Sequence, residues 1–127
     1  MSMVVLNAYR VEEMQFRNVL ETGAPITLEN QYSFNVEYTG GNKCVGEFFV
    51  EVYDRDNKKD FFAKTRIVAF YSYKEGMKKD SIHREAFRQI FPYAKSIITT
   101  ITANGGVPPI NLPAVDIDSQ NIYRLDI

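Results

Sequence analysis

Residues 28–38 alternate between apolar and polar side chains. The apolar positions are Leu28, Tyr32, Phe34, Val36 and Tyr38. A period of two predicts a strand with one buried face, because successive side chains of a strand point to opposite sides. The next residues, TGGNK at 39–43, contain two glycines, which tolerate the positive φ of a tight turn. We therefore expect a hairpin that leads into another strand.

Residues 4–16 also alternate, but their apolar positions change parity partway along. The first group is followed by a second group of opposite parity: Val5, Tyr9 and Val11, then Met14 and Phe16. A β-bulge at Glu12 or Glu13 brings both groups to one face, because it inserts one extra residue into the strand. Residues 17–27 have no sustained period, which is typical of a long loop.

Two more runs, residues 44–53 and 61–73, are apolar on both faces. One face carries Cys44, Phe48, Val50 and Val52 in the first run, and Ala63, Ile67, Ala69 and Tyr71 in the second. The other face carries five apolar residues among charged ones: Val45, Phe49, Tyr53, Val68 and Phe70. The polar residues 54–60 between the runs predict a solvated turn. Four strands joined by turns indicate an antiparallel sheet.

After residue 80 the apolar period becomes helical. Asp80 or Ser81 is the expected N-cap of a helix that ends at Phe91. Its apolar face consists of Ile82, Ala86, Phe87 and Ile90. Pro92 has no N–H for the hydrogen bond of a helix interior, so we expect it to begin a second helix, residues 92–103. The predicted fold is therefore α+β, a four-stranded antiparallel sheet with C-terminal helices packed on one face.

The second helix has an apolar stripe and a distinct end. The stripe consists of Ala94, Ile97, Ile98 and Ile101. Three threonines among residues 99–102 are poor helix formers, so packing must hold this helix. Residues 104–106 predict a left-handed C-cap. Three prolines then keep the chain extended, because they fix φ and disfavour helix before them: Pro108, Pro109 and Pro113.

Length and charge narrow the possible functions. The 127 residues fit a single domain, residues 1–127, and 15 basic against 16 acidic residues give a formal charge of −1. That balance offers no electrostatic attraction for nucleic acid or an anionic membrane, so neither is expected as a partner. Cys44 is the only cysteine, which excludes an internal disulfide and fits a reducing compartment. Without a long apolar run or a signal-peptide pattern, the expected location is cytoplasmic.

The polar residues do not form a recognisable catalytic or metal site. The acidic turn 54–60 has Lys58 and Lys59 where a calcium loop needs an oxygen donor and a glycine. His83, the only histidine, is expected on the surface of the first helix. Asp116 and Asp118 share one side of an extended segment and are expected to face water. We therefore predict no catalytic residue, metal or cofactor, and no enzyme.

The predicted helices can cover only one face of the sheet, yet the other face also carries apolar residues. Val45, Phe49, Tyr53, Val68 and Phe70 are therefore the predicted oligomer interface, because closed homo-oligomers bury such surface. A groove for an apolar partner is a compatible alternative, built from the loop at 17–27 and the proline segment.

The C-terminal part of the chain resembles the SecB family of export chaperones. Phe91, Pro92, Tyr93, Ala94 and Lys95 match the family's aromatic-Pro-Tyr-Ala-basic start of a long helix. The family's proline-rich stretch is matched at Gly106, Pro108, Ile110, Leu112, Val115 and Asp118. In this chain Pro113 and Ala114 are inverted relative to the family pattern, and Asp116 and Ile117 replace Asn and Phe. The resemblance extends weakly over residues 9–16 and 61–73.

This resemblance implies a four-stranded antiparallel sheet with helices on one face, assembled as a dimer of dimers. It also implies an ATP-independent holdase, which binds non-native polypeptides in hydrophobic grooves and keeps them unfolded for secretion. The residues expected to contact such clients are Met14, Phe16, Val19, Leu20, Ile26, Val107, Ile110 and Leu112. A proline-stiffened segment suits a groove wall, because it loses little conformational entropy on docking.

One departure from the family concerns the SecA motor, whose basic zinc-binding tail docks on an acidic patch in the exporting members. This chain retains Glu13 but has Arg17 and Lys64 where the family has acids. Like charges suppress docking, which argues against delivery to SecA. The alternatives to an export chaperone are a client-dedicated chaperone of a toxin-antitoxin system and a structural oligomerisation domain without a client.

Overall fold

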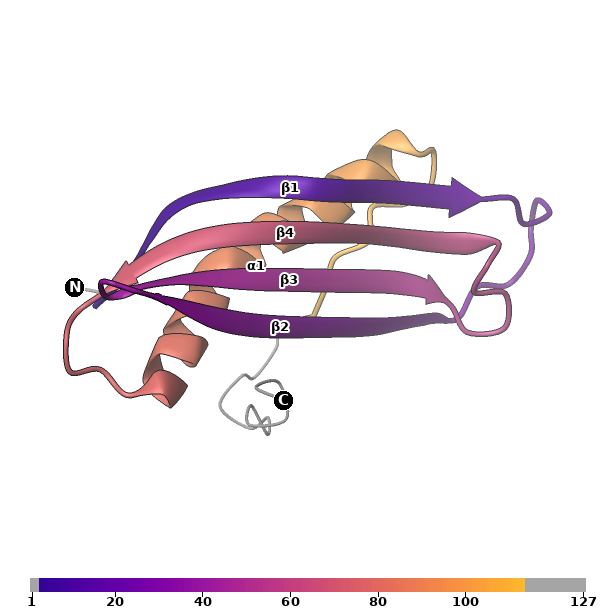
Figure 1. The fold of residues 1–127 in the computed structure, drawn as a ribbon. Helices are drawn as coiled ribbons and strands as arrows, with labels where there is room; N and C mark the ends of the chain where they lie inside the picture. The colour runs from indigo at the N-terminus through magenta and orange to yellow at the C-terminus, as the bar shows by residue number, and fades with distance from the viewer. Residues whose placement is uncertain (1–2, 114–127) are drawn as a thin grey trace.

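The computed structural model describes residues 3–113, which form four strands followed by one long helix (Figure 1). The elements are β1 (Val4–Asn18), β2 (Leu28–Gly40), β3 (Lys43–Asp54), β4 (Phe61–Tyr73) and α1 (Lys79–Asn104). All neighbouring strands are antiparallel and their order is β1-β4-β3-β2, so β1 and β2 are the edges. The predicted sheet is thus confirmed. Residues 114–118, including Asp116 and Asp118, lie outside the described residues.

The register of β1 contains two bulges. The pairing with β4 shifts between Val11 and Glu13, as the change of parity predicted, and again between Leu6 and Ala8. The second shift was not predicted, and it places Val5 on the sheet face opposite to Tyr9, which corrects their predicted grouping. The apolar positions on the helix side of β1 are Val4, Leu6, Tyr9, Val11, Met14 and Phe16.

The core lies between α1 and one face of the sheet, which α1 crosses obliquely (Figure 1). Phe87 of the helix packs edge-on against Phe34 of β2 and Phe48 of β3, with ring centroids 5.6 and 5.4 Å apart. Gly46 makes room for this packing, because a Cβ at that position would lie 2.8 Å from the Phe34 ring. The absence of a side chain on β3 therefore lets a large ring from β2 enter the core.

The expectation of two helices is wrong, since α1 runs through Pro92 without interruption. Its buried residues continue at four-residue spacing across the proline: Ile82, Ala86, Ile90, Ala94, Ile98 and Thr102. A proline in a helix interior costs ~3 kcal/mol, whereas burying one large aliphatic side chain contributes ~1.5–3 kcal/mol. Burial of Ile90 and Ile98 on a single straight stripe therefore offsets the missing hydrogen bond.

The ends of α1 also differ in part from the prediction. The helix begins at Lys79, and its cap residue Lys78 makes no side-chain hydrogen bond to the first turn. Asp80 instead lies inside the first turn, where the helix dipole favours a carboxylate. At the other end Gly106 has φ +85°, in agreement with the predicted left-handed cap.

Two polar residues expected in solvent are buried. His83 is four residues before Phe87 on the stripe that faces the sheet, and its ring packs edge-on against Phe34 at 5.1 Å. Asp54 ends β3 and its carboxylate accepts hydrogen bonds from the Thr27 N–H and the Asn57 amide. The prediction of a fully solvated turn at 54–60 is therefore wrong for Asp54, because its carboxylate organises the turn from within.

Candidate functional site

A groove opens at the end of the sheet where the loop before β2 meets the segment after α1. Residues 107–113 leave the C-terminus of α1 and run back across the helix-covered face toward β2 (Figure 1). Between this segment and the start of β2 is a cavity of about 350 Å³. We call it the apolar groove, and it is lined by Ile26, Leu28, Phe61, Val107, Pro108, Pro109, Ile110 and Asn111.

One wall of the apolar groove is held by hydrogen bonds at both ends of the loop 19–27. The Val19 N–H donates to the Asp60 carbonyl at 2.9 Å, and the Thr27 N–H donates to Asp54 Oδ1 at 2.8 Å. The Arg55 N–H donates to the Thr27 carbonyl at 2.8 Å. These bonds fix Thr27 on both sides, so its neighbour Ile26 has a defined place at the groove.

Asp54 is therefore part of the support of this wall. The backbone N–H of Thr27 and the side-chain amide of Asn57 both donate to the carboxylate, and they lower the pKa of Asp54. A carboxylate that accepts such bonds is stabilised in its ionised form. The charge on Asp54 thus helps to keep the loop in position.

The opposite wall is held by two threonines of α1. Thr102 Oγ1 accepts the Ile110 N–H at 2.9 Å, and Thr99 Oγ1 donates to the Ile110 carbonyl at 2.9 Å. Thr102 is buried and also donates to the Ile98 carbonyl. Both polar backbone groups of Ile110 are therefore satisfied by one helix face. The sequence interpretation noticed these threonines only as weak helix formers and missed this role.

Phe16 lies below the groove and joins β1 to the helix end. Its ring packs edge-on against Phe61, which lines the groove, at a centroid distance of 5.9 Å. A Cβ on Gly105 would lie 2.3 Å from the Phe16 ring. Gly105 therefore allows the phenylalanine to lie against the end of α1. Phe16 supports the groove through Phe61 and is not among the residues that line it.

The predicted client-contacting residues divide into three groups. Ile26, Val107 and Ile110 line the apolar groove. Val19 and Met14 are exposed elsewhere, and the half-buried Leu20 donates its N–H to the Asn18 side chain. Leu112 is only 4% exposed and belongs to the core, because the segment 107–113 crosses the sheet with this side chain inward.

Five residues that line the groove were not named individually in the sequence interpretation. Leu28 and Phe61 lie outside both predicted walls, whereas Pro108, Pro109 and Asn111 belong to the proline segment that was predicted as one wall. A signal existed for the first two, since each begins a strand beside a connecting segment at the same end of the antiparallel sheet. The alternation assigned Leu28 to the buried face and gave no reason to separate it from the core positions farther along β2. Its place beyond the edge of the helix depends on how α1 crosses the sheet.

The predicted oligomer interface lies on the sheet face away from α1, and one chain already covers much of it. Tyr53 and Val68 are each 8% exposed, Val45 and Phe49 are half-buried, and Phe70 is 36% exposed. Long cationic side chains lie over the rings of this face at centroid distances of 4.5–5.9 Å, in the pairs Lys58–Tyr53, Arg66–Phe49, Lys64–Phe62 and Arg10–Phe70. Such contacts shield aromatic rings from water, which weakens the original reason for an interface here.

The residues considered for SecA docking lie on this same face. Glu13 pairs in register with Arg66, and Arg17 with Phe62. The Lys64 ammonium lies 5.1 Å from the Phe62 ring, and the Gln15 amide donates to Glu13 at 3.3 Å. Arg66 also forms an ion pair with Glu47. The face is thus a lattice of both signs of charge, with no continuous acidic patch along β1 and β4.

Exposed apolar residues collect instead along β1 and the outer side of α1. Tyr9, Met14 and Tyr93 are all exposed, and the exposed Val5, although its side chain is on the other sheet face, lines a cavity at the β1 edge together with Pro92 and Tyr93. The rings of Tyr9 and Tyr93 contact each other at 4.7 Å between centroids, and the two residues are 41% and 43% exposed. This is a second apolar surface, separate from the groove, which we call the β1–α1 surface.

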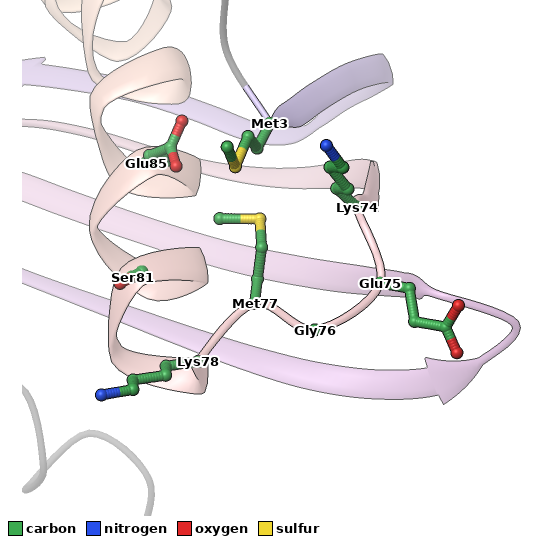
Figure 2. A pocket seen from close by; sticks show the side chains of 8 residues that line it. All are labelled: Met3, Lys74, Glu75, Gly76, Met77, Lys78, Ser81 and Glu85. Carbon is green, nitrogen blue, oxygen red and sulfur yellow. The ribbon is translucent and has the colours of Figure 1, made fainter.

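A further cavity, of about 380 Å³, lies at the connection between β4 and α1 (Figure 2). Met3 and Met77 point toward one another there, with Glu85 on the adjacent helix face. The polar side chains of its lining are Lys74, Glu75, Lys78, Ser81 and Glu85. In the part of the chain that the structure describes, no cluster of three or more His, Cys, Asp or Glu residues could hold a metal ion. Within that part no helix is long and apolar enough to span a membrane.

Comparisons with known proteins agree with the resemblance noted in the sequence. No family model matches the chain. A stretch of 57 residues, 42% of the chain, is 35% identical to the protein-export protein SecB of Ruegeria pomeroyi, and the match covers 33% of that protein. The chain thus spans about a third of the length of this curated relative.

Two solved structures are similar in fold. One is a Mycobacterium tuberculosis SecB-like chaperone in complex with a ChAD peptide from the HigA1 antitoxin, with TM-score 0.68, 14% identity and coverage of 89% of this chain and 91% of that one. The other is a Streptococcus agalactiae protein of unknown function, with TM-score 0.52, 11% identity and coverage of 87% and 97%. The predicted SecB-like fold is confirmed, and a stretch of 57 residues is also similar in sequence to a SecB protein.

Proposed function

We propose that this protein is a chaperone that holds exposed apolar segments of other polypeptides in the apolar groove. The supporting observation is the construction of the groove, whose two walls are apolar and are both fixed by hydrogen bonds before any ligand arrives. A preformed apolar site binds with little loss of conformational entropy. Holding a segment in this way needs no nucleotide and no covalent chemistry, in keeping with an ATP-independent holdase that is not an enzyme.

A client-dedicated role in a toxin-antitoxin system is the second candidate. It is favoured by one observation, the similarity in fold to a SecB-like chaperone solved with an antitoxin peptide. A dedicated chaperone binds one client segment more tightly than others, whereas a general holdase binds many unfolded chains with similar affinity. A third possibility, a structural domain without a client, predicts no peptide binding at all.

The groove can be tested with a pair of variants in one loop. Ile26 lines the groove and is 41% exposed, whereas Val19 is 54% exposed and does not line it. Ile26→Asp should weaken binding of a reduced, unfolded model polypeptide about tenfold or more, because a carboxylate is costly to bury. Val19→Asp should leave the affinity unchanged. Calorimetric titration measures both, and equal effects of the two variants would argue against the groove.

We also infer that copies of the chain associate through the β1–α1 surface. Its exposed tyrosines and aliphatic residues resemble the composition of protein interfaces more closely than the cation-covered outer sheet face does. Tyr93→Asp should therefore reduce the sedimentation-derived mass, whereas Phe70→Asp on the outer face should not. The opposite result would restore the interface predicted from the sequence. A homo-oligomer built this way, such as a dimer of dimers, leaves the groove accessible.

Docking to SecA is expected to be weak. The outer face has Arg17, Lys64 and Arg66 along β1 and β4 near Glu13, and the carboxylates of Glu12 and Glu47 are already paired with Arg10 and Arg66. A basic zinc-binding tail would meet cations there. Tight and salt-sensitive capture of that tail in a pull-down would contradict this expectation.

A further inference from the structure

The sequence contains a single Asn–Gly pair, at residues 104 and 105, where α1 ends. All asparagines within residues 3–113 are exposed, so exposure does not distinguish Asn104 from the others. The residue that follows does distinguish it, because glycine has no Cβ to obstruct its backbone nitrogen and adopts more conformations than any other residue. Asn104 is therefore the asparagine whose side chain the next backbone nitrogen reaches most easily.

The reaction open to this pair is attack of the Gly105 nitrogen on the side-chain amide carbon of Asn104. A C–N bond to Asn104 Cγ forms and the Cγ–Nδ2 bond breaks. The proton lost by the attacking nitrogen ends on the departing NH₂ group, which leaves as ammonia. Water then opens the resulting five-membered succinimide ring. Opening at the side-chain carbonyl gives aspartate, whereas opening at the main-chain carbonyl gives isoaspartate, and water is the only other reactant.

The hydrogen bonds of the Gly105 nitrogen belong to the last turn of the helix. Its N–H is shared between the Ile101 and Thr102 carbonyls, both at 3.0 Å. Shared bonds of this kind are common at helix termini, and helix ends fray. Gly105 is exposed and follows the last helical residue. Each opening of the final turn therefore releases the nitrogen for attack.

Isoaspartate would change the path of the chain at a closely packed point. It lengthens the main chain between Asn104 and Gly105 by one carbon, about 1.5 Å. A Cβ on Gly105 would lie only 2.3 Å from the Phe16 ring, so the chain cannot shift toward β1. Beyond the glycines, the Val107 N–H donates back to the Thr102 carbonyl at 3.4 Å. A longer link cannot preserve both the fit against Phe16 and this hydrogen bond.

The residues that would move form one side of the apolar groove. Residues 107–111, which we call the proline wall, line the groove directly after this turn. They are held to α1 through Ile110, whose backbone groups bond to Thr99 and Thr102. The new carboxylate adds an electrostatic disturbance, because the helix dipole is negative at this end and the last turn of α1 has no basic residue. A reaction at one exposed pair thus acts on the groove.

We propose that Asn104 and Gly105 are a self-modification site, at which isoaspartate forms and displaces the proline wall of the apolar groove. Formation of isoaspartate depends only on this pair and on water. Its effect on clients rests on the proposed function. An ageing population of the protein therefore divides into unmodified molecules with an intact groove and modified molecules without one.

Ageing of the purified protein at mildly alkaline pH tests the reaction. Peptide mapping by mass spectrometry should show loss of the Asn104 amide before that of any other asparagine. Protein isoaspartate methyltransferase should label the aged protein but not an aged Asn104→Ser variant, which has no amide to lose at this position. Asn42 is the internal control, because it is also exposed but is followed by lysine. Equal loss of the amides of Asn42 and Asn104 overturns the assignment of the site.

Hydrogen exchange tests the displacement of the proline wall. Anion exchange separates the deamidated fraction, which has one additional negative charge. The Asn104→Asp variant is the matched control, because it has the same charge without the longer main chain. The Ile110 amide, which donates to Thr102, should exchange faster in the deamidated fraction and remain protected in Asn104→Asp. Retained protection in both overturns displacement of the wall, and equal loss in both assigns the effect to charge and overturns the role of isoaspartate.

Binding of a reduced, unfolded model polypeptide separates this inference from the proposed function. The deamidated fraction should bind about tenfold more weakly than the unmodified protein, since the loss of one buried aliphatic contact corresponds to about this factor. Equal affinity of the two forms overturns the effect on the groove and leaves the proposed function intact. If the unmodified protein does not bind the polypeptide, the proposed function fails, and the exchange of Ile110 still decides whether isoaspartate displaces the wall.

Discussion

Removal of the Thr102 hydroxyl tests whether α1 holds the proline wall of the groove. Thr102→Val preserves the shape of the side chain but leaves the Ile110 N–H without its acceptor. Thr102 is fully buried and Ile110 is half-buried. A buried donor without a partner costs ~1–3 kcal/mol, so we expect the free energy of unfolding to fall by about 1–3 kcal/mol. The Thr102 hydroxyl also donates to the Ile98 carbonyl at 2.8 Å. That carbonyl already accepts a hydrogen bond within the helix, so loss of the hydroxyl's bond to it should change the free energy of unfolding little.

Hydrogen exchange resolves the effect to one residue. In the wild-type protein the Ile110 amide should be protected, whereas in Thr102→Val it should exchange faster than the amides of α1. Urea unfolding followed by circular dichroism gives the change in free energy of unfolding. Thr100→Val is the matched control, because Thr100 is a neighbouring threonine of the same helix that is exposed to solvent. Retained protection of Ile110 with unchanged stability would refute the role assigned to Thr102.

Two further changes probe the supports of the groove. Gly105→Ala should destabilise the protein by ~1–3 kcal/mol in a denaturant titration, because the new Cβ would lie 2.3 Å from the Phe16 ring. Adding Phe16→Leu to the same chain should restore part of the lost stability. Unchanged stability of Gly105→Ala would contradict the close approach. Asp54 has a lowered pKa, so its contribution is complete above the ordinary pKa of 3.8 and is lost as the pH falls through the folded value. The Asp54→Asn variant should therefore lose less stability than the wild type between neutral and acid pH in thermal melts, and parallel pH profiles would show that the carboxylate does not support the loop.

The strands could be predicted because each depends on a local pattern. Alternation at Phe34 and Val36 requires only that one face of the sheet be buried, and the change of parity before Met14 requires a bulge. The bulge at Asn7 escaped prediction because Val5 is as apolar as its neighbours, so the pattern of residues 4–16 does not show that Val5 faces outward. Apolar residues on an exposed face do not disturb a hydrophobic pattern.

The helix shows where local rules are overridden by tertiary packing. Pro92 is unfavourable in a helix interior, yet the stripe through Ile90 and Ala94 keeps its spacing and packs on one sheet. His83 follows the same stripe into the core. The four-residue spacing, given more weight than the proline, would have predicted both the continuous helix and the burial of His83. The hydrogen bonds of Thr99 and Thr102 to Ile110 could not be predicted from this spacing, because they depend on the path of the chain after Gly106.

The placement of the apolar surfaces connects assembly with client binding. The β1–α1 surface follows the β1 edge of the sheet, whereas the apolar groove lies at the end of the sheet beside the start of β2, the opposite edge strand. Gln89 occupies backbone groups of Val4 and Leu6 at the start of the β1 edge, whereas Leu28 at the start of β2 lines the apolar groove. A chain that extended both edges equally would add copies or clients without limit. Because one edge is partly closed and bulged and the other is continuous with a groove, self-association and client binding can proceed at separate places. Peptide affinity should therefore be independent of protein concentration across the range in which Tyr93→Asp changes the oligomeric state.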